Sequence, residues 1–213
     1  MVEVVFQYTY TDVNAELVRA CENLQRQNES HPDLEVEVTP PRRGEMATMM
    51  VSLGEGGASV YAQKKASIGT PHLPHIRLDV GDRRFAYLDE DEEPTVVKDT
   101  IDLVTEVYLA TETRPAFVYG MTEGVRQSFA DRDEYPISQS MVGKEVTEID
   151  HVTWLSIFPP ALVDTYGRER LLSAPAWHVD ELEDGAIVVV NWDDPTRIEP
   201  NDLHDHLQLG DGG

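Results

Sequence analysis

Residues 2–27 read VEVVFQYTYTDVNAELVRACENLQRQ, and this stretch decides the fold because it joins a strand to a helix. Residues 2–10 are rich in β-branched and aromatic side chains, which favour a β-strand. Thr11 and Asp12 then offer side-chain oxygens that can cap the start of a helix. Apolar residues recur at helical spacing after this cap; they are Val13, Leu17, Cys21 and Leu24. A strand followed by a helix that ends near residue 27 is therefore predicted.

The rest of the first half has the pattern of antiparallel strands. Residues 34–39 alternate apolar and acidic side chains, which is typical of a half-buried strand. GEGG at 54–57 and Gly81-Asp82 are turn sequences that predict two hairpins. The strands of these hairpins are expected at residues 46–53, 58–63, 76–80 and 83–88.

The clearest helix is predicted at residues 94–111, where apolar side chains follow the helical period. Lys98, Asp99, Asp102 and Glu106 occupy its polar side. Shorter elements follow it: strands at 116–119 and 152–158, helices at 123–130, 160–172 and 202–207, and a hairpin of 177–182 with 186–192. These patterns predict an α+β fold, with a mixed or antiparallel sheet packed by two or three helices. A single domain over residues 1–213 is expected, with two lobes at about 1–112 and 113–213 as the alternative.

The composition is strongly acidic, with 40 Asp and Glu against 17 Lys and Arg and a formal net charge of −23. Nucleic-acid binding by direct phosphate contact is not expected, because it needs a basic surface. No apolar run is long enough to span a membrane. The chain begins MVEVVFQYTYTD, without the basic and apolar segments of a signal peptide, so a cytoplasmic location is expected.

The acidic residues are spread along the chain, with dense stretches at 89–93 and 180–184. Thirteen of the basic residues are Arg and four are Lys. This composition is typical of a salt-adapted, haloarchaeal-like protein, in which concentrated salt screens the repulsion between carboxylates. The alternative is a negative surface that binds a basic protein partner, such as a nuclease.

No motif of strong catalytic specificity is present: G-x-S-x-G, P-loop and G-x-G-x-x-G sequences are all absent. Cys21 lies on the apolar side of its predicted helix, so it is interpreted as a core thiol. No catalytic residue and no cofactor are therefore predicted. Trp154, Trp177 and Trp192 fall in predicted strands and are expected to pack, whereas an exposed Trp would indicate a binding surface.

Two histidine pairs are weak candidates for a metal site. They are His72 and His75 in TPHLPH, and His204 and His206, with Asp202, in DLHDH. A metal ion needs three or four converging ligands, and prolines separate the first pair while the second lies near a chain end. Solvated histidines are the favoured interpretation, and a metal site is the alternative.

Residues 151–190, HVTWLSIFPPALVDTYGRERLLSAPAWHVDELEDGAIVVV, resemble the C-terminal half of bacterial immunity-type proteins. These belong to the polymorphic-toxin and type VI secretion immunity group. The shared features are a T-W-L strand, a short helix with a P-x-L-V start, a following Gly, then a strand and a D-G hairpin, and the likeness extends over about residues 115–208. It implies an α+β protein without catalysis that neutralises a toxin by binding it.

The favoured function is thus a non-enzymatic binding protein with a protein partner. A metal-assisted hydrolase using the histidines and a structural or oligomeric cytoplasmic protein are the alternatives. The sequence predicts no oligomeric state.

Overall fold

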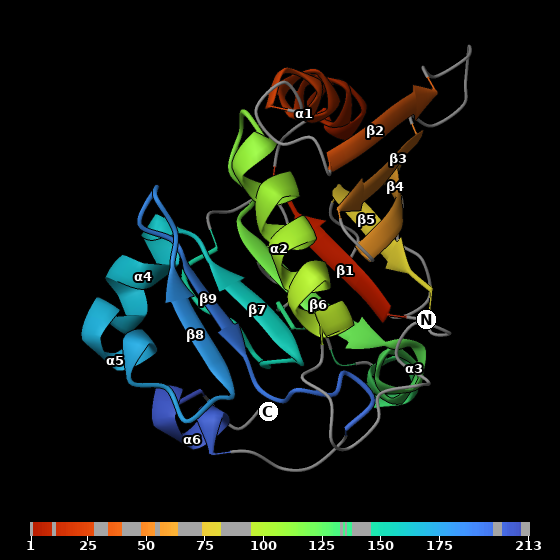
Figure 1. Ribbon diagram of the computed structural model, residues 1–213. Helices are drawn as coiled ribbons and strands as arrows, with labels where there is room; N and C mark the ends of the chain where they lie inside the picture. Colours follow the sequence, from red (N-terminus) through yellow and green to blue (C-terminus); the bar gives the residue numbers. More distant parts are fainter. Residues whose placement is uncertain are drawn as a thin grey trace.

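The computed structural model describes residues 2–9, 12–27, 34–39, 48–53, 56–63, 74–81, 95–132, 134, 136–137, 146–197 and 202–209. Its strands form one nine-stranded sheet in the order β2-β3-β4-β5-β1-β6-β7-β9-β8 (Figure 1). Neighbouring strands of this sheet pair in the antiparallel direction. The predicted α+β class is confirmed.

The first half of the chain builds one side of the sheet. β1 (Val2–Gln7) leads into α1 (Val13–Gln27), which carries the chain past three strand positions to β2 (Leu34–Thr39). The chain then returns to β1 through adjacent antiparallel strands. These are β3 (Thr48–Leu53), β4 (Gly56–Gln63) and β5 (His75–Val80).

The second half extends the sheet from the other edge of β1, where β6 (Phe117–Thr122) pairs with it. Both predicted lobes therefore contribute strands to one sheet. The remaining strands are β7 (Leu155–Phe158), β8 (His178–Glu181) and β9 (Ile187–Val190). The helices are α2 (Thr95–Ala110), α3 (Glu123–Arg132), α4 (Pro160–Tyr166), α5 (Arg168–Leu172) and α6 (Leu203–Leu207).

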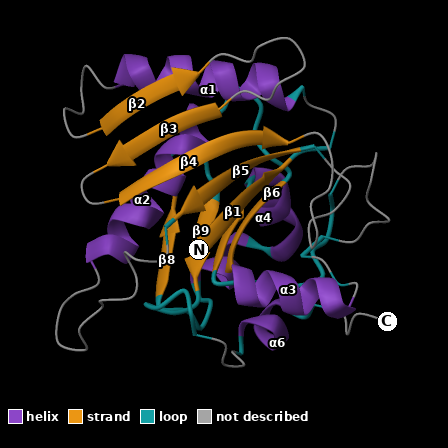
Figure 2. Cartoon of the chain, turned by 90° about the vertical axis from the view of Figure 1, so that its right-hand side faces the viewer, coloured by secondary structure: helices purple, strands orange, loops and turns teal. Residues whose placement is uncertain are grey.

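Helices cover both faces of the central strands. Side chains alternate along β1, so Val4 and Phe6 join the core under α1 and α2, whereas Val5 joins the core under α3 to α6. Figure 2 shows the sheet between α2 on one side and α3 and α6 on the other. This arrangement explains why β1 and β9 are buried along their whole length. Cys21 is buried in the first core, as its helical position predicts.

Two predicted elements differ in the structure. Both edges of β5 are paired along its length, with β4 and with β1, while its predicted hairpin partner at 83–88 lies outside the described residues. The predicted helix at 160–172 is interrupted at Gly167, whose φ of +89° ends α4 and starts α5. A φ in this range favours glycine, because other residues are strained there. None of the described helices combines the length and apolar character needed to cross a membrane.

Candidate protein-binding site

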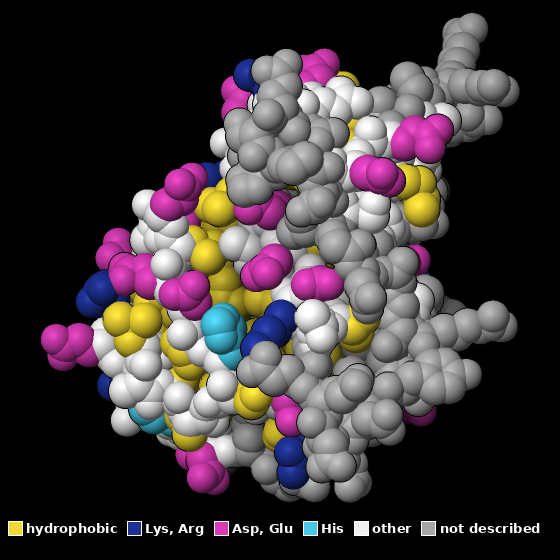
Figure 3. Space-filling view, viewed as in Figure 1, with side chains coloured by type: hydrophobic (Ala, Val, Ile, Leu, Met, Phe, Trp, Pro, Cys, Tyr) yellow, Lys and Arg dark blue, Asp and Glu magenta, His cyan; other side chains and the backbone are white. Residues whose placement is uncertain are grey.

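A groove lies between helix α2 and the edge strand β8 (Figure 3). It encloses about 390 Å³ and is lined by Lys98, Ile101, Asp102, Trp177 and His178. Trp177 is 38% exposed, and within the described residues only Met50 is a comparably exposed large apolar side chain. An exposed aromatic side chain in a groove is typical of a binding surface.

The helical period of α2 and the alternation of side chains along β8 determine which of their side chains face the groove. The apolar side of α2 packs on the sheet through residues such as Val97 and Val104, which leaves Asp102 on the flank that faces β8. In β8, His178 and Asp180 pair with Val190 and Val188, whose side chains belong to the core under α2. Their own side chains therefore project from the same face of the sheet as α2.

Carboxylates border the groove from both elements. Asp99, Asp102 and Glu106 form one stripe of α2, and Asp180 projects from β8. We call these four residues, together with the groove lining, the α2–β8 face. The ionisable groups of this face, leaving His178 aside, are four carboxylates and the ammonium of Lys98. Figure 3 shows acidic side chains around an apolar patch on this side of the molecule.

Asp102 is the carboxylate most affected by its surroundings. Partial exclusion of water raises its pKa above the ordinary value, and the neighbouring Asp99 carboxylate raises it further. His178 acts in the opposite direction and lowers it. A cation placed beside Asp102 would favour the charged form of its carboxylate and offset the repulsion from Asp99. The electrostatics of the site therefore favour a cationic ligand group.

Arg114 fixes the two walls of the groove relative to each other. Its Nε donates to Asp184 Oδ2 at 2.6 Å in the β8–β9 turn, and its Nη1 donates to three carbonyls near the C-terminal end of α2. Those carbonyls belong to Tyr108, Leu109 and Thr111. The guanidinium also lies 5.1 Å from the centre of the Tyr108 ring. One side chain thus caps the helix and holds the hairpin against it.

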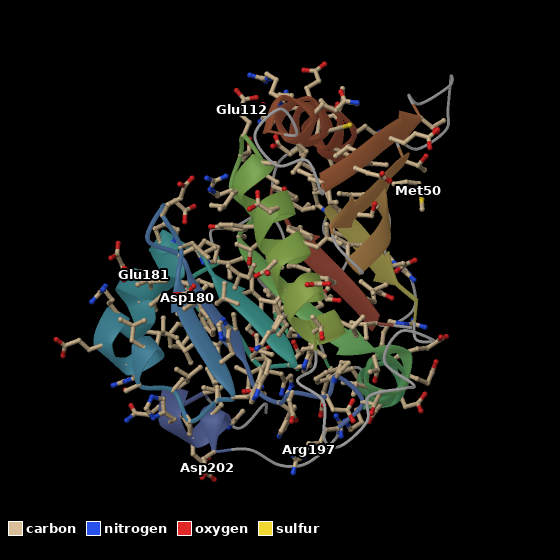
Figure 4. The ribbon with its side chains drawn as sticks, in the orientation of Figure 1. Met50, Glu112, Asp180, Glu181, Arg197 and Asp202 are labelled. Carbon is tan, nitrogen blue, oxygen red and sulfur yellow. The ribbon has the colours of Figure 1, made fainter. Side chains whose placement is uncertain are left out.

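The outer edge of β8 is poorly suited to the addition of another strand. Leu182 N donates to Ala186 O at 2.8 Å, so these two residues form a hydrogen-bonded pair of the hairpin. Hydrogen-bonded and non-hydrogen-bonded pairs alternate along antiparallel strands, and the N–H of Glu181 therefore points away from β9. Asp180 Oδ1 accepts that N–H at 2.9 Å. The carboxylate of Glu181, which is labelled in Figure 4, pairs with Arg168. A partner would therefore contact this region through side chains rather than through backbone pairing.

The three tryptophans do not share one environment. Trp154 is 3% exposed, and its Nε1 donates to the carbonyl of Trp192 at 2.9 Å. Packing, the favoured interpretation, holds for Trp154 and for the half-buried Trp192. Trp177 instead fits the alternative interpretation, a binding surface, because its side chain is exposed just before β8.

The histidine candidates for a metal site are dispersed. His75 is fully buried in β5, and His72 lies outside the described residues. His204 and His206 are in α6, where His206 Nε2 is 2.8 Å from the carbonyl of Arg170. Asp202 is exposed at the start of the same helix. Within the described parts of the chain, no group of three or more His, Cys, Asp or Glu is placed to hold a metal ion.

The structure brings His204 close to a histidine that the sequence analysis did not single out. The rings of His151 and His204 are 6.4 Å apart, and His151 also packs on Phe129 at 5.2 Å. His151 Nε2 is 3.9 Å from Glu134 Oε2. Burial lowers the pKa of His151, while the Glu134 carboxylate partly opposes this shift. Because 53 positions separate the two histidines in the chain (204 − 151), no local pattern indicates their proximity.

The polar side of α2 and the acidic stretch at 180–184 are evident in the sequence, but their proximity in space is not. The second acidic stretch, 89–93, lies outside the described residues. Trp177 and His178 complete the site, and the exposure of Trp177 was considered only as an alternative.

Comparisons with known proteins give one weak structural likeness. No family model matches the sequence, and no curated protein matches it. A similar solved structure is "Pseudomonas aeruginosa T6SS protein PA0821", with 13% sequence identity and a TM-score of 0.41. The match covers 88% of this chain and 64% of that one, so the chain spans less than two thirds of its length.

Proposed function

We propose that this chain is a non-enzymatic binding protein whose α2–β8 face receives a basic segment of a partner protein. The observation that carries this proposal is the exposed Trp177 in a groove lined by Asp102, with Asp180 projecting from the same face of the sheet. An excess of negative charge over the whole chain supports it, because a field of one sign speeds encounter with a partner of opposite charge.

The groove suits an arginine or lysine side chain of the partner. Such a cation can lie over the Trp177 ring, where cation–π attraction is about 0.5–2 kcal/mol, and can pair with Asp102. Ile101 supplies apolar contact for the methylene stem of the same side chain. Lys98 opposes a second cation nearby, so we expect one inserted side chain with further basic residues facing Asp99, Glu106 and Asp180.

An immunity-like role is one form of this function. Trp177 and Asp180 lie within residues 151–190, the segment that resembles immunity-type proteins, although neither is one of the shared features. An immunity protein neutralises a toxin by binding it, and nucleic-acid-degrading toxins carry basic surfaces because their substrate is polyanionic. We therefore propose a basic toxin as the partner class.

Site-specific crosslinking tests the proposal. A photoreactive benzoyl-phenylalanine replaces Asp180 on the proposed face or, as the matched control, the exposed Glu169 of α5. We expect position 180 alone to give an adduct in the source cells, with a basic protein that mass spectrometry identifies. Equal adducts from both positions, or none from position 180, would contradict the proposal.

The purified partner then allows a quantitative test. Trp177→Ala and Asp102→Asn should each weaken binding by about tenfold or more, since each removes a contact of the inserted cation. Glu169→Gln should leave the affinity unchanged. An unchanged Kd for both groove variants, measured by titration calorimetry, would show that the partner binds elsewhere.

A further inference from the structure

A second cavity lies beside helix α3 and shares no described lining residue with the groove of the α2–β8 face. It encloses about 260 Å³ between α3, the segment before β7 and the segment after β9. We call it the α3 pocket. The described residues that line it are Met121, Thr122, Gly124, Val125, Ser128, Phe129, Arg132, Val152, Thr153, Trp154, Trp192, Pro195 and Arg197.

Three aromatic residues contribute to the described lining of the α3 pocket. They are Phe129, Trp154 and Trp192. The bond from Trp154 Nε1 to the Trp192 carbonyl, at 2.9 Å, holds the two segments that carry the indoles together. The buried position of Trp154, which is 3% exposed, restricts its ring further. A fixed aromatic wall favours a flat, apolar ligand surface.

The charged side chains that line the α3 pocket in the described part of the chain are both basic, although the chain as a whole is acidic. Arg132 and Arg197 line it, and none of the described lining residues is Asp or Glu, although the chain has 40 acidic residues and 17 basic ones. Arg132 lies over the Phe129 ring at 5.7 Å, and its Nε is 2.8 Å from Glu134 Oε2. Glu134 holds this guanidinium without itself lining the described wall. Arg197 is labelled in Figure 4.

Besides the guanidinium groups and the two indole N–H groups, the polar side-chain groups of the described lining are hydroxyls. They belong to Thr122, Ser128 and Thr153. Thr153 Oγ1 already donates to the Leu155 carbonyl at 2.9 Å. The described lining contains no His, Asp, Glu, Cys or Lys that could activate a hydroxyl nucleophile. The arrangement therefore suits binding rather than transformation of a ligand.

We propose that the α3 pocket binds a small aromatic carboxylate of about the size of benzoate. A volume of about 260 Å³ corresponds to roughly nine water molecules at ~30 Å³ each, which matches a ligand of about that many heavy atoms. The ring lies against Phe129, Trp154 and Trp192. The carboxylate meets Arg132 and Arg197, because a guanidinium pairs with a planar carboxylate through two parallel hydrogen bonds.

Tryptophan fluorescence gives a direct test. The chain has three tryptophans, so in a Trp177→Phe variant both remaining indoles line the α3 pocket. Titration of this variant with sodium benzoate should give a saturable change in fluorescence. Benzamide, which has the same shape without charge, should bind at least about tenfold more weakly, because a hydrogen bond to a charged group contributes about 1.5–3 kcal/mol.

Arginine variants in the same background locate the site. Arg132→Gln and Arg197→Gln should each weaken benzoate binding by about tenfold. The exposed Arg170→Gln in α5 is the matched control and should not change it. Circular dichroism confirms that each variant is folded. Benzamide binding as tightly as benzoate, unchanged affinity in both pocket variants, or no saturable signal with benzoate would each overturn the proposal.

Discussion

At the scale of single residues, the buried carboxylate of Glu3 is an unusual feature of the sheet. Glu3 is 2% exposed in β1, and its Oε2 lies 3.2 Å from Arg77 Nη2 and 3.6 Å from Arg126 Nε. Burial nevertheless raises the pKa of Glu3 above its ordinary value of 4.5, because the loss of hydration outweighs the two guanidinium charges. Arg77 also pairs with Asp79, and Arg126 with Glu123, so neither cation depends on Glu3 alone.

A raised pKa of a carboxyl group means that the folded protein binds the proton more tightly than the unfolded chain does. The stability that protonated Glu3 contributes is thus fully present below about pH 4.5 and is lost as the pH rises through the folded-state pKa. Glutamine stays neutral at every pH, so Glu3→Gln should abolish the loss of stability that accompanies ionisation of Glu3. The variant should be more stable than the parent by on the order of 1 kcal/mol at neutral pH. Urea unfolding of both forms between pH 4 and pH 8 measures it. A variant that is less stable than the parent throughout would contradict the prediction.

At the scale of elements, Arg114 connects α2 to the β8–β9 hairpin. Arg114→Gln would leave Asp184 without its 2.6 Å partner and would remove one donor from each of three helix-terminal carbonyls, of which the Tyr108 carbonyl keeps Thr111 as a donor. We expect a loss of about 2–3 kcal/mol in the free energy of unfolding. The control is Arg170→Gln, which should change the free energy of unfolding by less than about 0.5 kcal/mol. Chemical denaturation checks both, and equal stability of the two variants would show that the Arg114 contacts are dispensable.

The same contacts set the width of the groove. Without the Arg114 contacts between α2 and the hairpin, the distance between Trp177 and Asp102 is no longer fixed. A partner must then order these two residues when it binds, and this costs binding free energy. Arg114→Gln should therefore also weaken partner binding, although Arg114 does not line the groove. The element scale thus links fold stability to the proposed function.

At the scale of the whole molecule, the net charge of −23 is the dominant property. Repulsion between spread carboxylates opposes the compact state, and it is screened as the Debye length falls from about 10 Å at 0.1 M salt to about 3 Å at 1 M. The melting temperature should therefore rise between 0.1 M and 2 M KCl. A variant with Asp164→Asn and Glu169→Gln, two exposed positions, should show a smaller rise. Calorimetry measures both, and a flat or falling melting temperature would contradict salt adaptation.

Local patterns in the sequence were enough to predict most described elements. The helical period over residues 94–111 gave α2 to within one residue at each end, since a helix is specified by neighbours three and four positions apart. The Glu183-Asp184-Gly185 turn predicted the β8–β9 hairpin, and Gly185 adopts the φ of +85° that the turn requires. The sequence predicts Gly167 within a helix, because nothing adjacent to it indicates a positive φ.

The sequence by itself determined the α+β class, most of the described elements and the net negative charge of the chain. Only the tertiary structure decided that β5 pairs with β1, that α2 meets β8, that His204 approaches His151 and that Arg132 and Arg197 share a pocket. The physical reason is that strands pair through backbone groups common to all residues. Which strands become neighbours is therefore decided by burial of both sheet faces over the whole chain, and not by any single stretch of it.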